Sequence, residues 1–253
     1  TYGSGITELD SSCFAGCTAL KEVKLPENIT AIPKAMFYGC TALKTIRIPD
    51  KVTEIQDSAF AGCSALIDVT LSEDLKALGD KAFMSCISLE SITIPDKTTR
   101  LGNSVFQNCS ALSEVQLSEN LYSIGTEAFR YCSKLNTLVL PASLRILESN
   151  EKGVAGTFAN SGLTEMVIPS TVRETGTEMF DECYSLQKLA VLGGDNSGLV
   201  EHYKEGIPYR KLEELTLNIP EVDVYSKYAP YLKKLVLGER VEKVADKSWT
   251  NTY

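Results

Sequence analysis

Phenylalanine recurs at a fixed interval along most of this chain of 253 residues. The first six copies are 23 residues apart, and two more follow after steps of 29 and 22 residues: Phe14, Phe37, Phe60, Phe83, Phe106, Phe129, Phe158 and Phe180. Self-similarity with a period of roughly 20–50 residues is typical of chains built from stacked structural units. The chain is therefore expected to stack about ten copies of one unit rather than to fold as an ordinary globular domain.

Other positions keep the same phase as the phenylalanines. Cysteine stands three residues after the Phe, leucine six after, and a Val/Ile and a Leu/Ile nine and eleven after, as in Leu43, Ile46 and Ile48. The last of these residues alternate with period two, which indicates a short strand with one buried face. Proline often follows directly and ends the strand, because it lacks an N–H. The stretch 57–63 has the composition of a helical turn.

These patterns predict one parallel sheet with one strand per repeat and the Phe series buried on the opposite side. Stacking buries a continuous apolar core that a single unit cannot form, which explains why the same positions stay apolar in each copy. The strands are expected to be centred near residues 24, 47, 70, 93, 116, 139, 167, 190, 216 and 236.

The unit F-x-x-C-x-x-L-x-x-I-x-I-P resembles the repeat of the BspA-like leucine-rich-repeat family of bacterial surface proteins. The resemblance is close over residues 5–192 and loose beyond them. It implies a curved solenoid, an extracellular or cell-surface location, and a role in adhesion or host-protein binding. Together with the helical turns, the expected fold class is an α/β repeat: a leucine-rich-repeat solenoid with a curved parallel sheet and short helical turns on the convex side.

The chain is expected to form a single leucine-rich-repeat domain over residues 1–253. Regular repeats occupy residues 5–192, an irregular insertion 193–211, and degenerate repeats 212–253; a shorter interruption falls at residues 148–157. The sequence begins and ends within a repeat, and neither end carries the polar cap that a solenoid needs. We therefore expect a fragment of a longer chain.

The net charge of the chain makes some classes of binding partner less favourable than others. The formal net charge is −8 and the isoelectric point is near 4.9. This balance argues against a nucleic-acid partner and against docking on anionic lipid. No stretch approaches the ~18 consecutive apolar residues of a membrane span.

The eight cysteines allow three interpretations. Seven occupy one position in successive repeats: Cys17, Cys40, Cys63, Cys86, Cys109, Cys132 and Cys183. Stacking would place their Cα atoms about 4.8 Å apart, within disulfide range, but with parallel Cβ vectors that suit a bridge poorly. A ladder of buried free thiols is favoured, with disulfides and a metal site as the alternatives.

No constellation indicates catalysis or a cofactor. His202 is the sole histidine and stands in the irregular insertion, and the glycine-rich run 193–198 lacks the phosphate-loop and calcium-loop patterns. The chain is therefore not expected to be an enzyme. The favoured function is a surface-exposed or secreted protein-binding module, and a structural spacer or self-associating repeat array is the alternative.

The predicted binding site lies on the exposed face of the strands. Down the stack, the central outward position turns apolar towards the carboxyl end, at Val139, Val167, Ala190 and Val236, with Glu165 and Lys188 as a charged rim. The insertion could add aromatic anchors at its edge, Tyr203 and Tyr209. Two other interpretations remain at this stage: valine favours strands in any case, or the insertion covers the stripe and makes it core.

Overall fold

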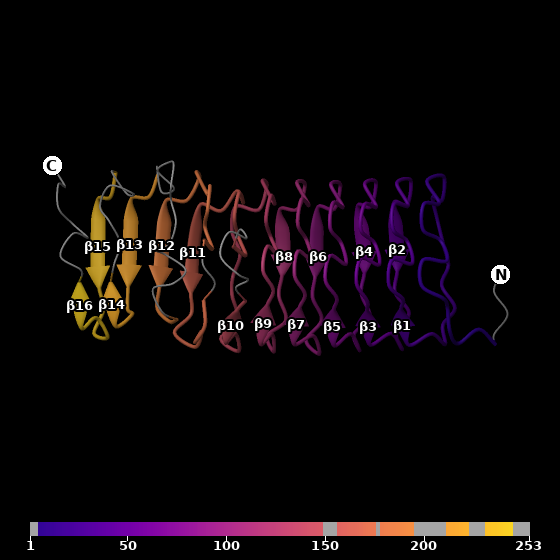
Figure 1. Cartoon of the computed structure of the whole chain (residues 1–253), viewed down its shortest axis with the longest axis horizontal. Coiled ribbons are helices and arrows are strands. Elements are labelled where there is room, and N and C mark those ends of the chain that lie inside the picture. The colour runs from indigo at the N-terminus through magenta and orange to yellow at the C-terminus, as the bar shows by residue number, and fades with distance from the viewer. Residues whose placement is uncertain (1–4, 149–155, 176–177, 195–210, 223–230, 245–253) are drawn as a thin grey trace.

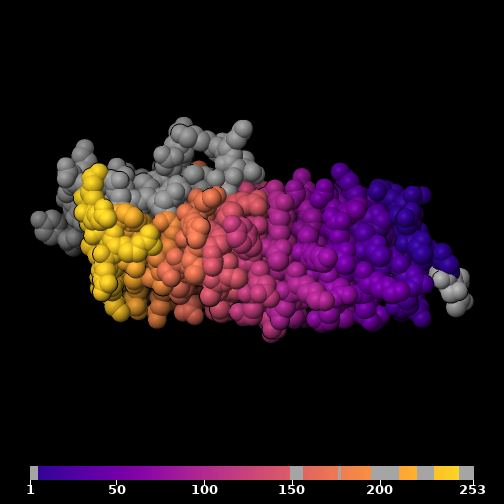
Figure 2. Space-filling view, turned by 90° about the horizontal axis from the view of Figure 1, so that it is seen from below, coloured from indigo at the N-terminus to yellow at the C-terminus, as the bar shows by residue number. Residues whose placement is uncertain are grey.

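The computed structural model describes residues 5–148, 156–175, 178–194, 211–222 and 231–244. The chain forms an elongated stack in which each repeat is one coil, with the two ends of the chain at opposite ends of the stack (Figure 1). The stack extends nearly straight across both views, so the expected curvature is slight (Figures 1 and 2). No helix in the described residues is long and apolar enough to pass through a lipid bilayer.

One ladder of parallel strands lies shortly before the Phe of each unit, as β3 lies before Phe60. Its six two-residue strands follow chain order: β1 (Ala31–Ile32), β3 (Glu54–Ile55), β5 (Ala77–Leu78), β7 (Arg100–Leu101), β9 (Ser123–Ile124) and β10 (Ile146–Leu147). Ile32 pairs with Ile55, and Ile55 with Leu78. The register thus advances by one whole repeat at each step, and the ladder holds the coils in phase.

The second ladder carries the predicted strands and forms what we call the strand face. Its members are β2 (Thr45–Arg47), β4 (Asp68–Thr70), β6 (Ser91–Thr93), β8 (Glu114–Gln116), β11 (Glu165–Ile168), β12 (Lys188–Val191), β13 (Glu214–Leu217) and β15 (Lys234–Leu237). The pairs β2–β4 and β6–β8 form separate two-stranded sheets, and β11, β12, β13 and β15 form a four-stranded one. A further parallel pair joins β14 (Glu221–Val222) and β16 (Lys243–Val244).

The expectation of ten strands in one sheet is only partly correct. All pairings are parallel, and eight of the ten strands occur where the repeat places them, but the segments centred at residues 24 and 139 form no strand. Within the described part of the chain, no backbone hydrogen bond joins residues 137–140 to a neighbouring strand. These segments keep their place in the stack without completing a ladder.

The prediction of short helical turns was wrong: the described residues contain no helix. The turn that follows each strand of the first ladder, as residues 57–63 follow β3, uses part of its N–H groups differently. Those of Ser58, Phe60 and Gly62 donate to carbonyls of the next repeat at 2.7–2.8 Å. Ser58 and Gly62 also have positive φ angles of 57° and 76°, which break a right-handed helix. Alternate N–H groups of the turn thus bond to the next repeat, while those of Ala61 and Cys63 bond within the turn, to Ser58 and Phe60; a helix would bond all of them within itself.

The phenylalanines form a single column through the core. Successive ring centroids lie 5.2–6.1 Å apart with interplanar angles of 5–24°. The longest step joins Phe129 to Phe158, so the additional residues of that unit do not interrupt the column. Seven of the rings are fully buried, and Phe14, in the first coil, is half-buried. The predicted burial of the Phe series is confirmed for those seven.

The cysteine ladder is buried and unbridged at six of its seven positions. Each of these six thiols lies 3.0–3.2 Å from the Phe carbonyl of the preceding repeat, as the Cys63 Sγ does from the Phe37 oxygen. Burial raises the pKa of Cys63 and of Cys109 to about 12. Cys17 departs from the prediction because it is exposed in the first coil, as is Cys13.

Candidate functional site

The outward-facing residues of the strand face form two straight columns. In β2, Thr45 and Arg47 are exposed on either side of the buried Ile46, and β4 and β6 repeat this pattern. The strand register places Glu165, Lys188, Glu214 and Lys234 in one column. The other contains Val167, Ala190, Thr216 and Val236. The columns expected from the sequence therefore exist over the four-stranded sheet.

A depression of about 570 Å³ lies across these columns, and we call it the apolar hollow. Val139, Val167 and Ala190 line it, with Leu140, Ala142 and Pro169 on one side and Glu165, Lys188 and Glu214 on the other. Five of the six predicted residues that the structure describes, all except Val236, thus contribute to one surface.

The valines of the apolar hollow are open to solvent. Val139 is 83% exposed and Val167 is 53% exposed, while Ala190 is half-buried. Exposed apolar side chains that gather in one depression are a common feature of contact surfaces. The insertion that the alternative interpretation would place over this stripe lies, from residue 195 to residue 210, outside the described residues.

The charged rim beside the hollow is partly neutralised by its own members. Lys188 Nζ lies 3.6 Å from Glu214 Oε1, and Lys234 Nζ lies 3.7 Å from Glu214 Oε2. These side chains are substantially exposed, so each pair contributes little to stability. Glu165 forms no ion pair within the described residues, although its register neighbour is Lys188. The carboxylate next to the two exposed valines therefore forms no ion pair with a described residue, because the adjacent Lys188 pairs with Glu214.

Three of the predicted site residues lie either away from the hollow or outside the described residues. Val236 does not line the hollow: it lies on β15, the edge strand, where Leu235 and Leu237 are also about 40% exposed. Tyr203 and Tyr209 lie outside the described residues. Sequence reasoning overlooked Glu214 and Thr216, which do line the hollow. Both occupy the predicted columns, and a search restricted to apolar residues passes over them.

A second depression, of about 420 Å³, lies nearer the amino end of the strand face. Its lining is polar: Asp68, Glu73 and Asp96 surround the hydroxyls of Thr70 and Thr93. We call it the acidic hollow. No group of three or more His, Cys, Asp or Glu side chains within the described ranges is arranged to hold a metal ion. What the strand face offers is contact area of two kinds, apolar and anionic.

Comparisons with known proteins agree with this architecture. The family model described as BspA type leucine rich repeat region matches residues 1–113, 30–151, 99–229 and 154–252. No curated protein gave a significant match. The crystal structure of a leucine-rich repeat protein from Bacteroides ovatus is similar, with 23% identity over 98% of this chain and 68% of that one and a TM-score of 0.65. The T. pallidum leucine-rich repeat protein shows 26% identity over 70% and 72% of the two chains, with a TM-score of 0.51.

Proposed function

The chain belongs to the BspA-type leucine-rich-repeat family, and on that premise we propose that it is a protein-binding module that docks its partner on the strand face. The observation that carries the proposal is the apolar hollow, with Val139 and Val167 exposed at its centre and Glu165, Lys188 and Glu214 at its rim. An apolar centre within a polar border is the usual composition of a protein interface.

The proposal extends to place and kind of partner. A surface-exposed or secreted module whose role is adhesion fits the BspA-type repeat. Its partner would be a protein, such as a matrix or mucosal protein of a host. The net charge of −8 favours a protein over nucleic acid or an anionic membrane.

We also propose that the chain acts as one domain throughout. The register between β12 and β13 continues across the insertion at 193–211, from Leu189 to Leu215. A partner bound at the hollow would therefore contact strands on both sides of the insertion, since β11, β12 and β13 share one sheet.

The test is a double substitution at the hollow. Val139→Asp with Val167→Asp places two carboxylates at its centre while leaving the buried face of the strand unchanged. Circular dichroism should show an intact fold, because both side chains are exposed. Binding to an array of immobilised matrix and mucosal proteins should fall about tenfold or more for the partner recognised by the wild type.

The matched control is Ile67→Asp with Ile87→Asp. These isoleucines are 45% and 44% exposed, and neither lines the apolar hollow. This variant should bind as the wild type does. Unchanged binding by a folded V139D/V167D protein would remove the hollow as the site. A wild-type protein that binds nothing on the array and instead sediments as a growing assembly would favour the self-associating array.

A further inference from the structure

We infer that the occupant of the apolar hollow is an extended, basic segment of the partner protein: an apolar side chain enters the hollow, and lysine or arginine side chains follow towards the amino end of the stack. This inference rests on the proposed function and adds the chemistry of the partner. It is carried by the distribution of charge along the strand face, in which carboxylates outnumber the cations that could neutralise them.

The first carboxylate without an ion pair to a described residue lies at the rim of the apolar hollow. Lys188 and Lys234 both approach Glu214, so that one carboxylate takes two cations. Glu165, which lines the hollow beside Val167, has no ion pair in the described part of the chain. A cation on the partner, next to its apolar anchor, would give Glu165 the ion pair that neither lysine of this column makes with it.

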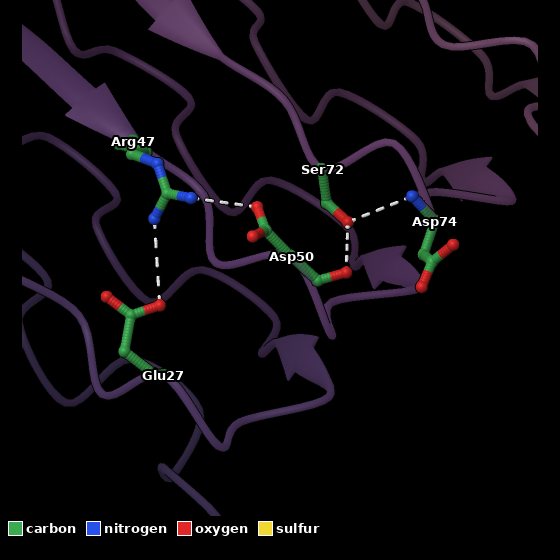
Figure 3. A network of polar contacts seen from close by, with 5 residues as sticks. All are labelled: Glu27, Arg47, Asp50, Ser72 and Asp74. Atoms are coloured by element: carbon green, nitrogen blue, oxygen red, sulfur yellow. Dashed lines mark hydrogen bonds and ion pairs between the residues drawn. The ribbon is translucent and has the colours of Figure 1, made fainter.

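Further negative charge comes from a column of five acidic residues that follow the carboxyl ends of the strand segments: Glu27, Asp50, Glu73, Asp96 and Glu119. Arg47 neutralises the first two, at 3.6 Å from Glu27 Oε2 and 2.8 Å from Asp50 Oδ1 (Figure 3).

Beyond Asp50, no cation of the described residues forms an ion pair with an acid of this column. Ser72 occupies the next turn, where its hydroxyl bonds to the Asp50 carbonyl and to the Asp74 N–H at 2.8 and 3.1 Å (Figure 3). Lys97, the nearest base in the following repeat, pairs with Asp74 in the adjacent column. Within the described residues, Glu73, Asp96 and Glu119 form no ion pair. Glu73 and Asp96 line the acidic hollow.

The geometry sets the spacing within the partner. Adjacent strands lie about 4.8 Å apart, and the turn of Asp96 is three repeats from that of Val167, which gives roughly 14 Å. An extended peptide covers about 3.3 Å per residue. Basic side chains three to six residues from the apolar anchor would therefore reach Glu119, Asp96 and Glu73. Long-range attraction between the column and such a segment would also speed association.

The experiment is a selection of linear twelve-residue peptides displayed on phage against the wild-type chain. Enriched sequences should contain an apolar residue with lysine or arginine three to six positions to one side. Synthetic versions should lose about tenfold in affinity for V139D/V167D and for E73Q/D96N/E119Q near 0.1 M salt. The matched control E8Q/D10N/E54Q removes three exposed acids that line neither hollow, and it should bind within about twofold.

The outcomes separate this inference from the proposed function. Enriched peptides that depend on Val139 and Val167 but are neutral or acidic would overturn the basic segment and leave the hollow as a binding site. Peptides indifferent to V139D/V167D would overturn both. Failure to enrich any linear peptide would overturn the extended segment, as would affinity that does not fall when salt is raised.

Discussion

The phenylalanine column should be the main source of stability, and substitution at its centre tests this directly. Phe83 is fully buried, with its ring centroid 5.2 Å from that of Phe60 and 5.8 Å from that of Phe106. Phe83→Ala removes a buried ring and leaves a cavity between two others, which costs about 3–5 kcal/mol. Of this, the two lost ring pairs account for about 1–3 kcal/mol.

The matched comparison is Phe14→Ala, at the start of the column. Phe14 is half-buried, and among the described rings it stacks on Phe37 alone, at 5.5 Å. The same substitution should therefore cost about half as much, near 2 kcal/mol. Phe83→Leu keeps apolar volume and loses the stacking, and should cost about 1–3 kcal/mol. Urea unfolding followed by circular dichroism measures all three. Equal losses for F83A and F14A would refute the claim that two-sided stacking sets the cost.

Three further predictions follow from the thiols and from a glycine. In native protein without reductant, only the two exposed thiols, Cys13 and Cys17, should react quickly with a thiol reagent, whereas denatured protein should titrate close to eight; a denatured count near zero would mean bridges. Burial raises the pKa of Cys63 and of Cys109 to about 12, whereas a thiol in the unfolded chain has a pKa of ~8.5. The stability that the two neutral thiols contribute is therefore fully present below the unfolded pKa and is lost as pH rises towards 12. C63A/C109A should therefore lose stability less steeply over that range, and identical slopes would contradict this. Gly102→Ala would place a Cβ 2.6 Å from the Asp80 nitrogen and from the Gly79 carbonyl carbon, so it should lower the free energy of unfolding by about 1–3 kcal/mol. Gly5→Ala is the control, because a Cβ there has nothing within 4 Å. Equal midpoints of urea unfolding for the two variants would show that neighbouring repeats do not lie so close together.

The repeating core was predictable from the sequence because every unit must place an apolar residue at the same positions. Phe60 and Cys63 are buried because neighbouring repeats place identical side chains above and below them. The columns of the strand face followed from the same period, which is why Val167 and Ala190 were correctly placed side by side. Such inferences need only the period and the alternation of a strand.

What the sequence did not reveal depends on hydrogen bonds between repeats. The stretch 57–63 has the composition of a helical turn, yet the N–H groups of Ser58, Phe60 and Gly62 bond to the next coil, and nothing within a single unit signals that choice. Val139 has a strand-like sequence around it, but residues 137–140 form no ladder with the described strands. The apolar hollow joins residues from four repeats, among them Leu140, Pro169 and Thr216, and the strand columns alone do not show which side chains outside them complete its lining.

The central claim is that a partner occupies the apolar hollow of the strand face. Hydrogen–deuterium exchange with and without a saturating selected peptide measures this most directly, since the amides of residues 137–140 lack backbone partners among the described residues and should exchange fast in the free chain. Binding at the hollow should slow exchange at residues 137–142, 165–170 and 188–192 and leave exchange in the turns around Phe60 and Phe180 unchanged. Protection confined to those turns, or to the ladder of β1 to β10, would contradict it.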